Sequence, residues 1–356
     1  MSRFLSQRFA SIEPYVPGEQ PQGRKYIKLN TNESPYPPAP GVLEAINREE
    51  VAKLRLYSDP DARPLVAAIA RRFGVGEDQV FVGNGSDEVL AFTFLAFGGA
   101  EKRFRFPALS YGFYPVFARL LGVTYEAVPL RPDFTIDPAD YIGCKTNIVL
   151  ANPNAPTGYA LGLETIGEIA RSNPDSIVVI DEAYVDFGGE SAAVLLDTYD
   201  NLLVVQTFSK SRCLAGMRIG FALGSAELIA DLQRMKFSFN PYNLDRLAIL
   251  AGTAAMEDEA YLNTCTAKIC ATRRRVTDRL REMGFTVLES KANFVFAKRD
   301  GIPGGRLFAA LREKGILVRH WEDPLIADYL RISIGSDEEM DAFLAAAGQI
   351  LEEETK

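Results

Sequence analysis

Two apolar runs in the middle of the chain, SIVVIDEAY at residues 176–184 and NLLVVQTFSK at residues 201–210, decide the fold. Each is rich in Val, Ile and Leu on successive positions and then ends in polar side chains. A strand that is apolar on both faces is typical of a mainly parallel sheet covered by helices. The two runs therefore predict buried strands that carry Asp181 and Lys210 at their carboxyl ends, where open α/β sheets bind ligands.

Similar runs lie on either side of these two, with helix-like patterns between them. They are QVFVG at 79–83, NIVLANP at 147–153 and RIGFALG at 218–224. This alternation predicts an α/β domain with a large, mainly parallel sheet over residues 41–245. The first forty residues, rich in Pro, Asn and Tyr, predict an extended N-terminal arm.

The last part of the chain has a different pattern. A long charged helical stretch runs through RRRVTDRLREMG at 273–284 and is followed by short strand candidates and a final amphipathic helix. The candidates are TVLES at 286–290, NFVFAK at 293–298, ILVRH at 316–320 and LRISIG at 330–335. Residues 246–356 are therefore expected to form a smaller α+β domain.

Composition excludes several classes of protein. The 356 residues carry a formal net charge of -8, which argues against a nucleic-acid or anionic-membrane partner. Four cysteines without a CxxC pair and a single histidine predict no metal site and reduced thiols. The N-terminus lacks the apolar core of a signal peptide, and no later stretch is long enough to span a bilayer. We expect a cytoplasmic protein.

The segment VGNGSDE at 82–88 contains the first candidate binding residues. Gly85 permits tight backbone geometry, and Ser86 and Asp87 open a helix whose free N–H groups can hold a phosphate. A Ser/Asp helix cap after a glycine turn gives the same pattern without any ligand.

A carboxylate at the end of the apolar run at 176–184 needs a partner. Ionised Asp181 can hold a pyridinium nitrogen protonated, and Tyr184, three residues on, can donate to the phenolic oxygen of such a ring. A helix-capping aspartate beside a tyrosine on the rim of the site is the structural alternative.

The segment TFSKSRCLAGMRIG at 207–220 is the most informative. Thr207, Ser209 and Arg218 surround Lys210 with two hydroxyls and a cation, a set that can clamp a phosphate ester beside a lysine. Partial desolvation and a cationic neighbour lower the pKa of such a lysine, which can then attack an aldehyde and act as a general base. A surface lysine lying along a strand end is the alternative.

In the order NPNAPTG (152–158), DEAYVDF (181–187) and TFSKSRCLAGMRIG, the chain resembles the fold-type I pyridoxal-phosphate aminotransferases. Further segments are similar to the histidinol-phosphate aminotransferases within that family. These are LNTNESPYPP (29–38), GNGSDE (83–88), KANFVF (291–296), GILVRH (315–320) and LRISIG (330–335). The resemblance covers nearly the whole chain.

The resemblance implies a role for each candidate residue toward pyridoxal 5'-phosphate. Lys210 would bond covalently to the cofactor and move the substrate's proton, while Asp181 and Tyr184 would contact its ring nitrogen and ring oxygen. Tyr111, in SYGFYP at 110–115, would stack on the ring, although a core tyrosine would look the same. The cofactor phosphate would be held by Gly85, Ser86, Asp87, Thr207, Ser209 and Arg218. Tyr57, in LYSDPDARP, would reach the cofactor phosphate of a partner subunit, which implies a homodimer with shared sites.

One position departs from the family pattern. Members commonly carry NPNNPTG, with an asparagine that binds the ring oxygen, and this chain has Ala155 there. Asn154 is the expected substitute, with a structural Asx turn as the alternative.

The substrate side of the site is expected in the last domain and the arm. Arg331 and Arg319 end two strand candidates and can grip a carboxylate or phosphate, Arg319 having a surface ion pair as its alternative. Tyr15 and Asn32, in the arm, are expected to line the substrate pocket unless they only pack there.

The expected function is amino transfer from histidinol phosphate, a phosphorylated amine, to 2-oxoglutarate, giving imidazole acetol phosphate and glutamate in histidine biosynthesis. An aromatic or broad-specificity aminotransferase would use the same residues. Threonine-phosphate decarboxylase, a lyase, has a closely similar chain. The fourth alternative is a non-catalytic regulator that binds the cofactor. Such regulators usually carry a basic DNA-binding domain, and none is visible in this sequence.

Overall fold

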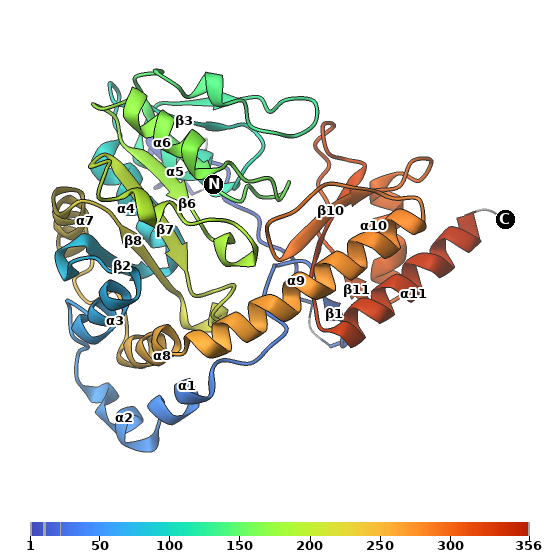
Figure 1. The fold of residues 1–356 in the computed structure, drawn as a ribbon, viewed down its shortest axis with the longest axis horizontal. Helices are drawn as coiled ribbons and strands as arrows, with labels where there is room; N and C mark the ends of the chain where they lie inside the picture. Colours follow the sequence, from blue (N-terminus) through green and yellow to red (C-terminus); the bar gives the residue numbers. More distant parts are fainter. Residues whose placement is uncertain (1, 10–11, 22, 355–356) are drawn as a thin grey trace.

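A seven-stranded sheet forms the centre of the larger part of the molecule (Figure 1). It belongs to a computed structural model that describes residues 2–9, 12–21 and 23–354. The strand order is β2-β8-β7-β6-β5-β3-β4. The strands are β2 (Val80–Asn84), β3 (Phe104–Pro107), β4 (Tyr125–Val128), β5 (Asn147–Ala151), β6 (Val178–Asp181), β7 (Leu202–Thr207) and β8 (Ile219–Leu223).

The sheet is mainly parallel, which confirms the predicted fold class. Strands β4, β3, β5, β6 and β7 pair in parallel, and β8 pairs antiparallel with both β7 and β2. Asp181 at the end of β6 lies opposite Val205 of β7. The residues that follow both strands therefore emerge at one edge of the sheet, as the apolar runs predicted.

Helices cover both faces of this sheet because successive residues of each strand point to opposite sides. In β5, Ile148 and Leu150 pack into one apolar core, while Val149 and Ala151 pack into the other. The first core is closed by α1 (Pro40–Ala45), α3 (Arg63–Phe73), α6 (Leu163–Ser172) and α8 (Arg246–Glu257). The second is closed by α4 (Gly85–Phe97), α5 (Phe113–Leu121) and α7 (Ala226–Phe239). The short helix α2 (Arg48–Ala52) lies at the bottom of the view in Figure 1.

A smaller antiparallel sheet, of order β12-β10-β9, lies to the right in Figure 1. Its own apolar core is built from this sheet and the three last helices. The elements are β9 (Thr286–Val287), β10 (Phe294–Lys298), β12 (Tyr329–Ser333), α9 (Glu259–Glu282), α10 (Gly304–Glu313) and α11 (Asp337–Glu354). Each of the four strand candidates of this region contains strand residues. The run ILVRH contains the short strand β11 (Ile316–Leu317).

The N-terminal segment joins the two parts of the molecule. Its described residues are mostly extended or irregular, as predicted, with a 3-10 turn at Gln7–Phe9. Its strand β1 (Ile27–Lys28) pairs in parallel with β11, and the backbone N–H of Ser333 in β12 donates to Leu29. The chain then passes from the smaller sheet toward the larger one.

The packing of α8 bears on the division into domains. Ala248, Ala251 and Met256 of this helix lie in the same apolar core as the large sheet. We therefore propose that the boundary expected after residue 245 lies at the start of α9 instead, with the arm 1–40 and the large sheet region otherwise as expected.

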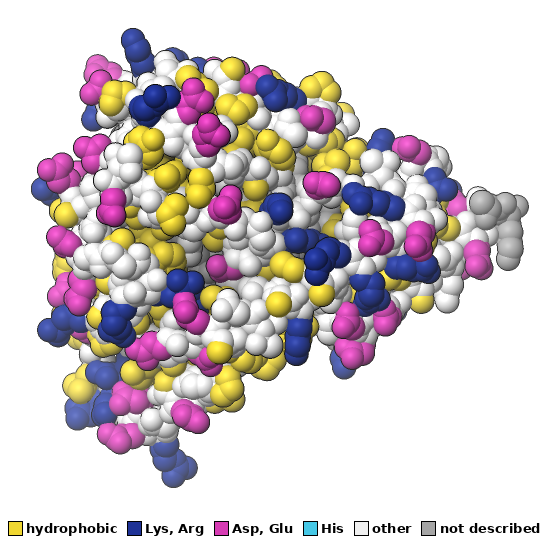
Figure 2. Space-filling view, viewed as in Figure 1, with side chains coloured by type: hydrophobic (Ala, Val, Ile, Leu, Met, Phe, Trp, Pro, Cys, Tyr) yellow, Lys and Arg dark blue, Asp and Glu magenta, His cyan; other side chains and the backbone are white. Residues whose placement is uncertain are grey.

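Among the described residues, no helix combines the length and apolar character needed to cross a bilayer. The face in Figure 2 carries Lys/Arg and Asp/Glu side chains interspersed with each other.

At Gly220, strand β8 lies close to the start of α4. A Cβ at this position would overlap the backbone of Gly85 and Ser86. We predict that Gly220→Ala lowers the free energy of unfolding by about 1–3 kcal/mol, the usual cost of overpacking. Gly99→Ala is the control, since a Cβ there meets no atom within 4 Å. Urea unfolding of both variants checks this, and equal stability of the two would contradict it.

Candidate active site

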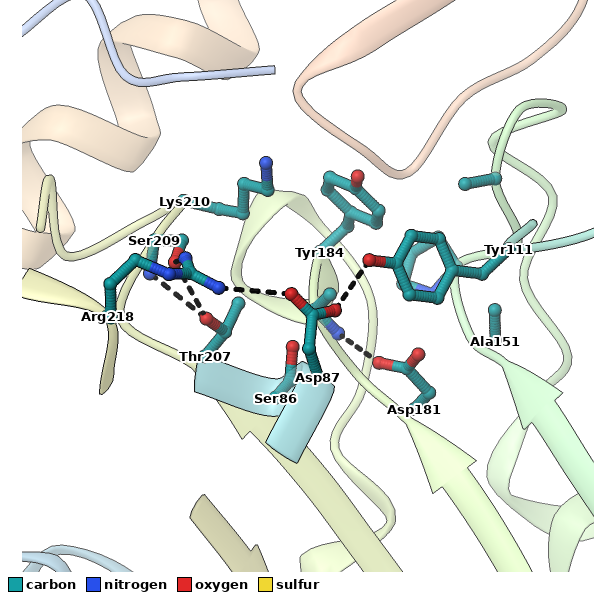
Figure 3. Close-up of a pocket in the computed structure, with 13 residues that line it drawn as sticks. Ser86, Asp87, Tyr111, Ala151, Asp181, Tyr184, Thr207, Ser209, Lys210 and Arg218 are labelled. Carbon is teal, nitrogen blue, oxygen red and sulfur yellow. Dashed lines mark hydrogen bonds and ion pairs between the residues drawn. The ribbon is translucent and has the colours of Figure 1, made fainter. Parts of the chain in front are cut away.

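A cavity of about 560 Å³, open solvent at its mouth included, lies at the carboxyl ends of β5, β6 and β7 and the first turn of α4. Figure 3 shows the side chains that line it. They are Ser86, Asp87, Tyr111, Ala151, Pro153, Ala155, Asp181, Ala183, Tyr184, Thr207, Ser209, Lys210 and Arg218. The structure thus brings together most of the candidate residues of three separate motifs.

Asp181 forms a buried acidic end of the cavity and is only 4% exposed. Its carboxylate accepts hydrogen bonds from Tyr114 Oη at 2.8 Å and from the backbone N–H of Ala183 at 3.3 Å. Burial raises the pKa of Asp181 to about 6, and the hydrogen bond from Tyr114 acts against that rise. Both donors are neutral, and no Lys or Arg in the described part of the chain forms an ion pair with this carboxylate. A cationic ring nitrogen would form such a pair.

Lys210 lies three residues beyond the end of β7 at Thr207, and its side chain is partly exposed to the cavity. Its Nζ donates to the backbone carbonyl of Thr31 at 3.0 Å and lies 5.8 Å from the centre of the Tyr184 ring. Desolvation, with the positive charge of Arg331 next in importance, lowers the pKa of Lys210 to about 8. The amine is therefore neutral in a substantial fraction of molecules near neutral pH, which is what a nucleophile or general base requires.

The opposite end of the cavity is built to hold an anion. Ser86 lies in the first turn of α4, where backbone N–H groups are free, and Arg218 Nη1 donates to Ser209 Oγ at 3.3 Å. Thr207 Oγ1 lies 3.1 Å from the same Ser209 Oγ. Asp87 pairs with Arg218 at 3.0 Å. The carboxylate of Asp87 would repel a phosphate, so its contribution is confined to its backbone N–H.

Gly85 explains how Arg218 fits against this turn. Gly85 has φ +78°, and a Cβ on it would lie 2.5 Å from Nη2 of Arg218. Arg218 itself adopts a left-handed conformation with φ 52°. The glycine therefore lets the guanidinium lie against the helix start.

Two tyrosines form the walls of the cavity. Tyr111 donates to Asp87 Oδ1 at 2.6 Å, which fixes its ring beside the cavity. Tyr184 accepts a hydrogen bond from Asn32 Nδ2 at 3.0 Å, and burial raises its pKa. Tyr114, which the sequence did not single out, is fully buried behind Tyr111 and holds Asp181. The second tyrosine of SYGFYP, which is Tyr114, is the sequence feature that could have indicated this residue.

The two candidate substrate arginines have different environments. Arg331 donates through Nη2 to the carbonyl of Asn30 at 2.9 Å, while its buried Nε has no partner among the described residues. Arg319 donates to the carbonyls of Val16 and Pro17 in the N-terminal arm, at 3.0 and 3.2 Å. Arg331 thus retains a free donor, and the guanidinium of Arg319 is occupied in holding the arm.

The arm so held carries Tyr15 to the site. The Tyr15 ring stacks on Phe113 with centroids 4.3 Å apart and lies 6.3 Å from the ring of Tyr111. Tyr15 is half-buried, and burial raises its pKa. Tyr15 therefore lies beside the wall of the cavity that Tyr111 forms. Its role in lining a substrate pocket stays a prediction.

Asn154 does not line the cavity, although Pro153 and Ala155 on either side of it do. Its buried amide donates to Leu109 O and Thr157 Oγ1, both at 3.1 Å, and its Oδ1 accepts from Ser110 at 2.7 Å. The alternative interpretation, a structural turn, describes this geometry. We therefore correct the expectation that Asn154 replaces the asparagine missing at position 155.

Two further candidates lie outside the cavity. Tyr57 is 79% exposed and stacks on Tyr242, with ring centroids 4.5 Å apart. Asn32 is 1% exposed and lies behind Tyr184 instead of facing open space. Tyr57 is therefore not part of the cavity of its own chain. The expectation of a shared site requires this, because it assigns Tyr57 to the cavity of a partner subunit.

The donor set fits pyridoxal phosphate. A neutral amine can bond its aldehyde, the buried carboxylate without a cation can pair with its ring nitrogen, and the hydroxyls, guanidinium and helix start can hold its phosphate. The residues for these three tasks are Lys210, then Asp181, and then Ser86, Thr207, Ser209 and Arg218.

Comparisons with known proteins agree with this chemistry. Residues 24–346 match the family model described as aminotransferase class I and II. The chain is 54% identical over 354 residues to histidinol-phosphate aminotransferase 2 of Dechloromonas aromatica, covering 98% of this chain and 99% of that protein.

Solved structures extend the likeness to the fold. Histidinol-phosphate aminotransferase from Sinorhizobium meliloti, in complex with pyridoxal-5'-phosphate, superposes with a TM-score of 0.87 at 26% identity, covering 99% of this chain and 100% of that one. L-threonine-O-3-phosphate decarboxylase from Porphyromonas gingivalis gives a TM-score of 0.78 at 23% identity, covering 91% of this chain and 99% of that one. The second likeness concerns the fold alone.

The lowered pKa of Lys210 can be measured in protein prepared without the cofactor. Competitive acetylation, followed by mass spectrometry of the peptide, should give a midpoint near pH 8 in the folded protein. The same lysine in the denatured chain should titrate near its ordinary value of 10.5. The sign follows from burial, which disfavours the charged amine, so reactivity begins at lower pH in the folded state. Equal midpoints in the two states would contradict this cause.

Proposed function

Because the chain belongs to the class I and II aminotransferase family, we propose that it is a histidinol-phosphate aminotransferase that uses pyridoxal phosphate. It moves the amino group of histidinol phosphate to 2-oxoglutarate, which yields imidazole acetol phosphate and glutamate. In the cell the flux runs in the reverse direction, toward histidine. A cytoplasmic location belongs to this proposal.

One observation carries the chemical part of the proposal. The amine of Lys210, with its pKa lowered to about 8, and the buried carboxylate of Asp181 line the same cavity. A cavity lined by an amine that loses its proton easily and by an ionised carboxylate suits a ligand with an electrophilic carbon at one end and a basic nitrogen at the other.

Bound pyridoxal phosphate supplies an aldehyde for amine exchange and a ring that accepts the electron pair released at the substrate carbon. The chain's residues do the rest. With the cofactor bound, Lys210 Nζ would be the base that accepts the proton from the substrate carbon that bears the amine. Its contact with the Thr31 carbonyl keeps the amine at the mouth of the cavity beside Tyr184.

Asp181 and Tyr184 set the charge around the ring. Asp181 stays ionised above its pKa of about 6, and a cation beside it favours that state further. Tyr114 and the N–H of Ala183 hold the carboxylate in place. The hydroxyl oxygen of Tyr184 accepts a hydrogen bond from Asn32 Nδ2, so its own O–H is free to donate into the cavity.

Arg331 provides the anion site on the substrate side. Its guanidinium carries a fixed charge and a free buried Nε, and it suits the phosphate of one substrate and a carboxylate of the other. Both half-reactions then use the same cation. Arg319 contributes by fixing the arm that carries Tyr15.

Exposed apolar side chains support a homodimer. Leu43, Leu56, Tyr57 and Phe239 are 50–79% exposed. The stacking of Tyr57 on Tyr242 brings the segment after α2 next to the end of α7, so part of this apolar surface is continuous. Surfaces of this kind mark protein contacts. In the proposed dimer, Tyr57 reaches the phosphate end of the partner's cavity.

A substrate panel tests the function. With 2-oxoglutarate as acceptor, we predict that histidinol phosphate is used at least about tenfold more efficiently (kcat/KM) than aromatic amino acids, since a phosphate brings more negative charge and more acceptor oxygens to Arg331 than a carboxylate does. Lys210→Ala is the inactive control. Preference for aromatic amino acids would favour a broad-specificity enzyme, and carbon dioxide from threonine phosphate would favour the lyase.

Complementation tests the shared site. Tyr57→Ala and Lys210→Ala should each have little activity at limiting cofactor, and mixed dimers should recover about a quarter of the wild-type rate, because random mixing leaves one intact site in half of the dimers. The chains are unfolded together and refolded to exchange subunits. No recovery, with dimers verified by light scattering, would contradict the sharing of Tyr57.

A further inference from the structure

Asn32 has an unusual backbone conformation for a buried residue. Its φ is 57°, in the left-handed region, and its side chain is 1% exposed. A residue other than glycine adopts this conformation at a cost, which the surrounding structure must offset. The contacts of Asn32 identify what offsets it.

Three side chains satisfy the polar groups of Asn32. Ser333 Oγ accepts from the Asn32 N–H at 2.9 Å and donates to Asn32 Oδ1 at 2.8 Å. Asn293 Nδ2 donates to the Asn32 carbonyl at 3.0 Å, and Asn32 Nδ2 donates to Tyr184 Oη at 3.0 Å. Ser333 ends β12 and Asn293 precedes β10, so the smaller sheet holds Asn32 from two strands.

The peptide unit between Thr31 and Asn32 connects this anchor to the reactive amine. One of its ends is the Asn32 N–H, held by Ser333, and the other is the Thr31 carbonyl, which accepts from Lys210 Nζ at 3.0 Å. A peptide unit is planar, so fixing the N–H fixes the direction of the carbonyl. Asn32 thus contacts Tyr184 through its side chain and is linked to Lys210 through the peptide unit that it shares with Thr31.

We propose that Asn32 is a positioning residue, anchored by Ser333, that aligns the Lys210 amine and the Tyr184 hydroxyl. This rests on the function proposed above and changes the role expected for Asn32, which does not line the substrate pocket. Through it, the position of the smaller sheet determines where the amine points. The substrate-side Arg331 lies on the same strand, β12, so substrate contact and amine placement share one support.

Two variants test the proposal. Asn32→Gly keeps a backbone that tolerates positive φ and removes the side chain. Ser333→Ala removes the hydroxyl that fixes the peptide unit. We expect kcat to fall about tenfold or more in both, with KM for the amino donor within about twofold of wild type. A rise in KM with kcat unchanged would mean that Asn32 contacts substrate, which would overturn the proposal.

A second readout does not depend on activity. The Thr31 carbonyl accepts from the charged amine and favours it, so a loosened carbonyl lowers the pKa of Lys210 further. Competitive acetylation of the cofactor-free variants should give a midpoint about half a pH unit or more below that of wild type. An unchanged midpoint in folded Ser333→Ala would overturn the proposal.

Asn173→Gly is the matched control. Asn173 is equally buried at 1% exposure and its amide donates to the carbonyls of Tyr141 and Ile169. It ends α6 before β6 begins, so it lies at the edge of the sheet opposite the cavity. This variant should lose stability in urea and keep both kcat and the Lys210 midpoint. A shift equal to that of Asn32→Gly would show a general loss of stability and overturn the proposal. The wild-type substrate panel tests the function separately.

Discussion

The site depends on the burial of two adjacent parallel strands. Every residue of β6 and β7 is buried, and each strand delivers a chemically active group at its carboxyl end, Asp181 from β6 and Lys210 just beyond β7. Apolar packing on both faces fixes the register of the strands and hence the relative position of these groups. The same burial removes water from both, which raises the pKa of the carboxyl and lowers that of the amine. The same apolar burial therefore stabilises the sheet and shifts the pKa values of Asp181 and Lys210.

Charge is distributed along the cavity in a way that net charge does not reveal. The chain is acidic overall, yet Arg218 stands at the helix end of the cavity and Arg331 on the side of the smaller sheet. Lys210 lies near both cations, and both lower its pKa. In the proposed function, a phosphorylated substrate and a phosphorylated cofactor would each have one cation to pair with, and the same two cations add to the desolvation that lowers the pKa of the amine.

The central sheet and the main cavity residues were predictable because they depend on local patterns. Apolar runs indicate buried strands, and their ends indicate the site. The strands β3 and β4 were missed because they are short and carry Arg105 and Glu126, whose ion pair at 2.8 Å is a contact across strands that no local pattern reveals. Asn154 was misassigned because the direction of its amide depends on Ser110, more than forty residues away. The left-handed backbone conformation of Asn32 likewise depends on a hydrogen bond to a distant residue, Ser333, 301 residues away in the sequence. Sequence patterns thus located the strand ends, and tertiary contacts determined which neighbouring side chains face the cavity.

The proposed chemistry requires that the Lys210 amine reaches a bound aldehyde. Reduction of the protein with borohydride in the presence of pyridoxal phosphate, followed by peptide mapping, measures whether it does. We expect a stable adduct on the peptide that contains Lys210, in a ratio of one per chain. An adduct confined to other lysines, with Lys210 unmodified, would contradict it.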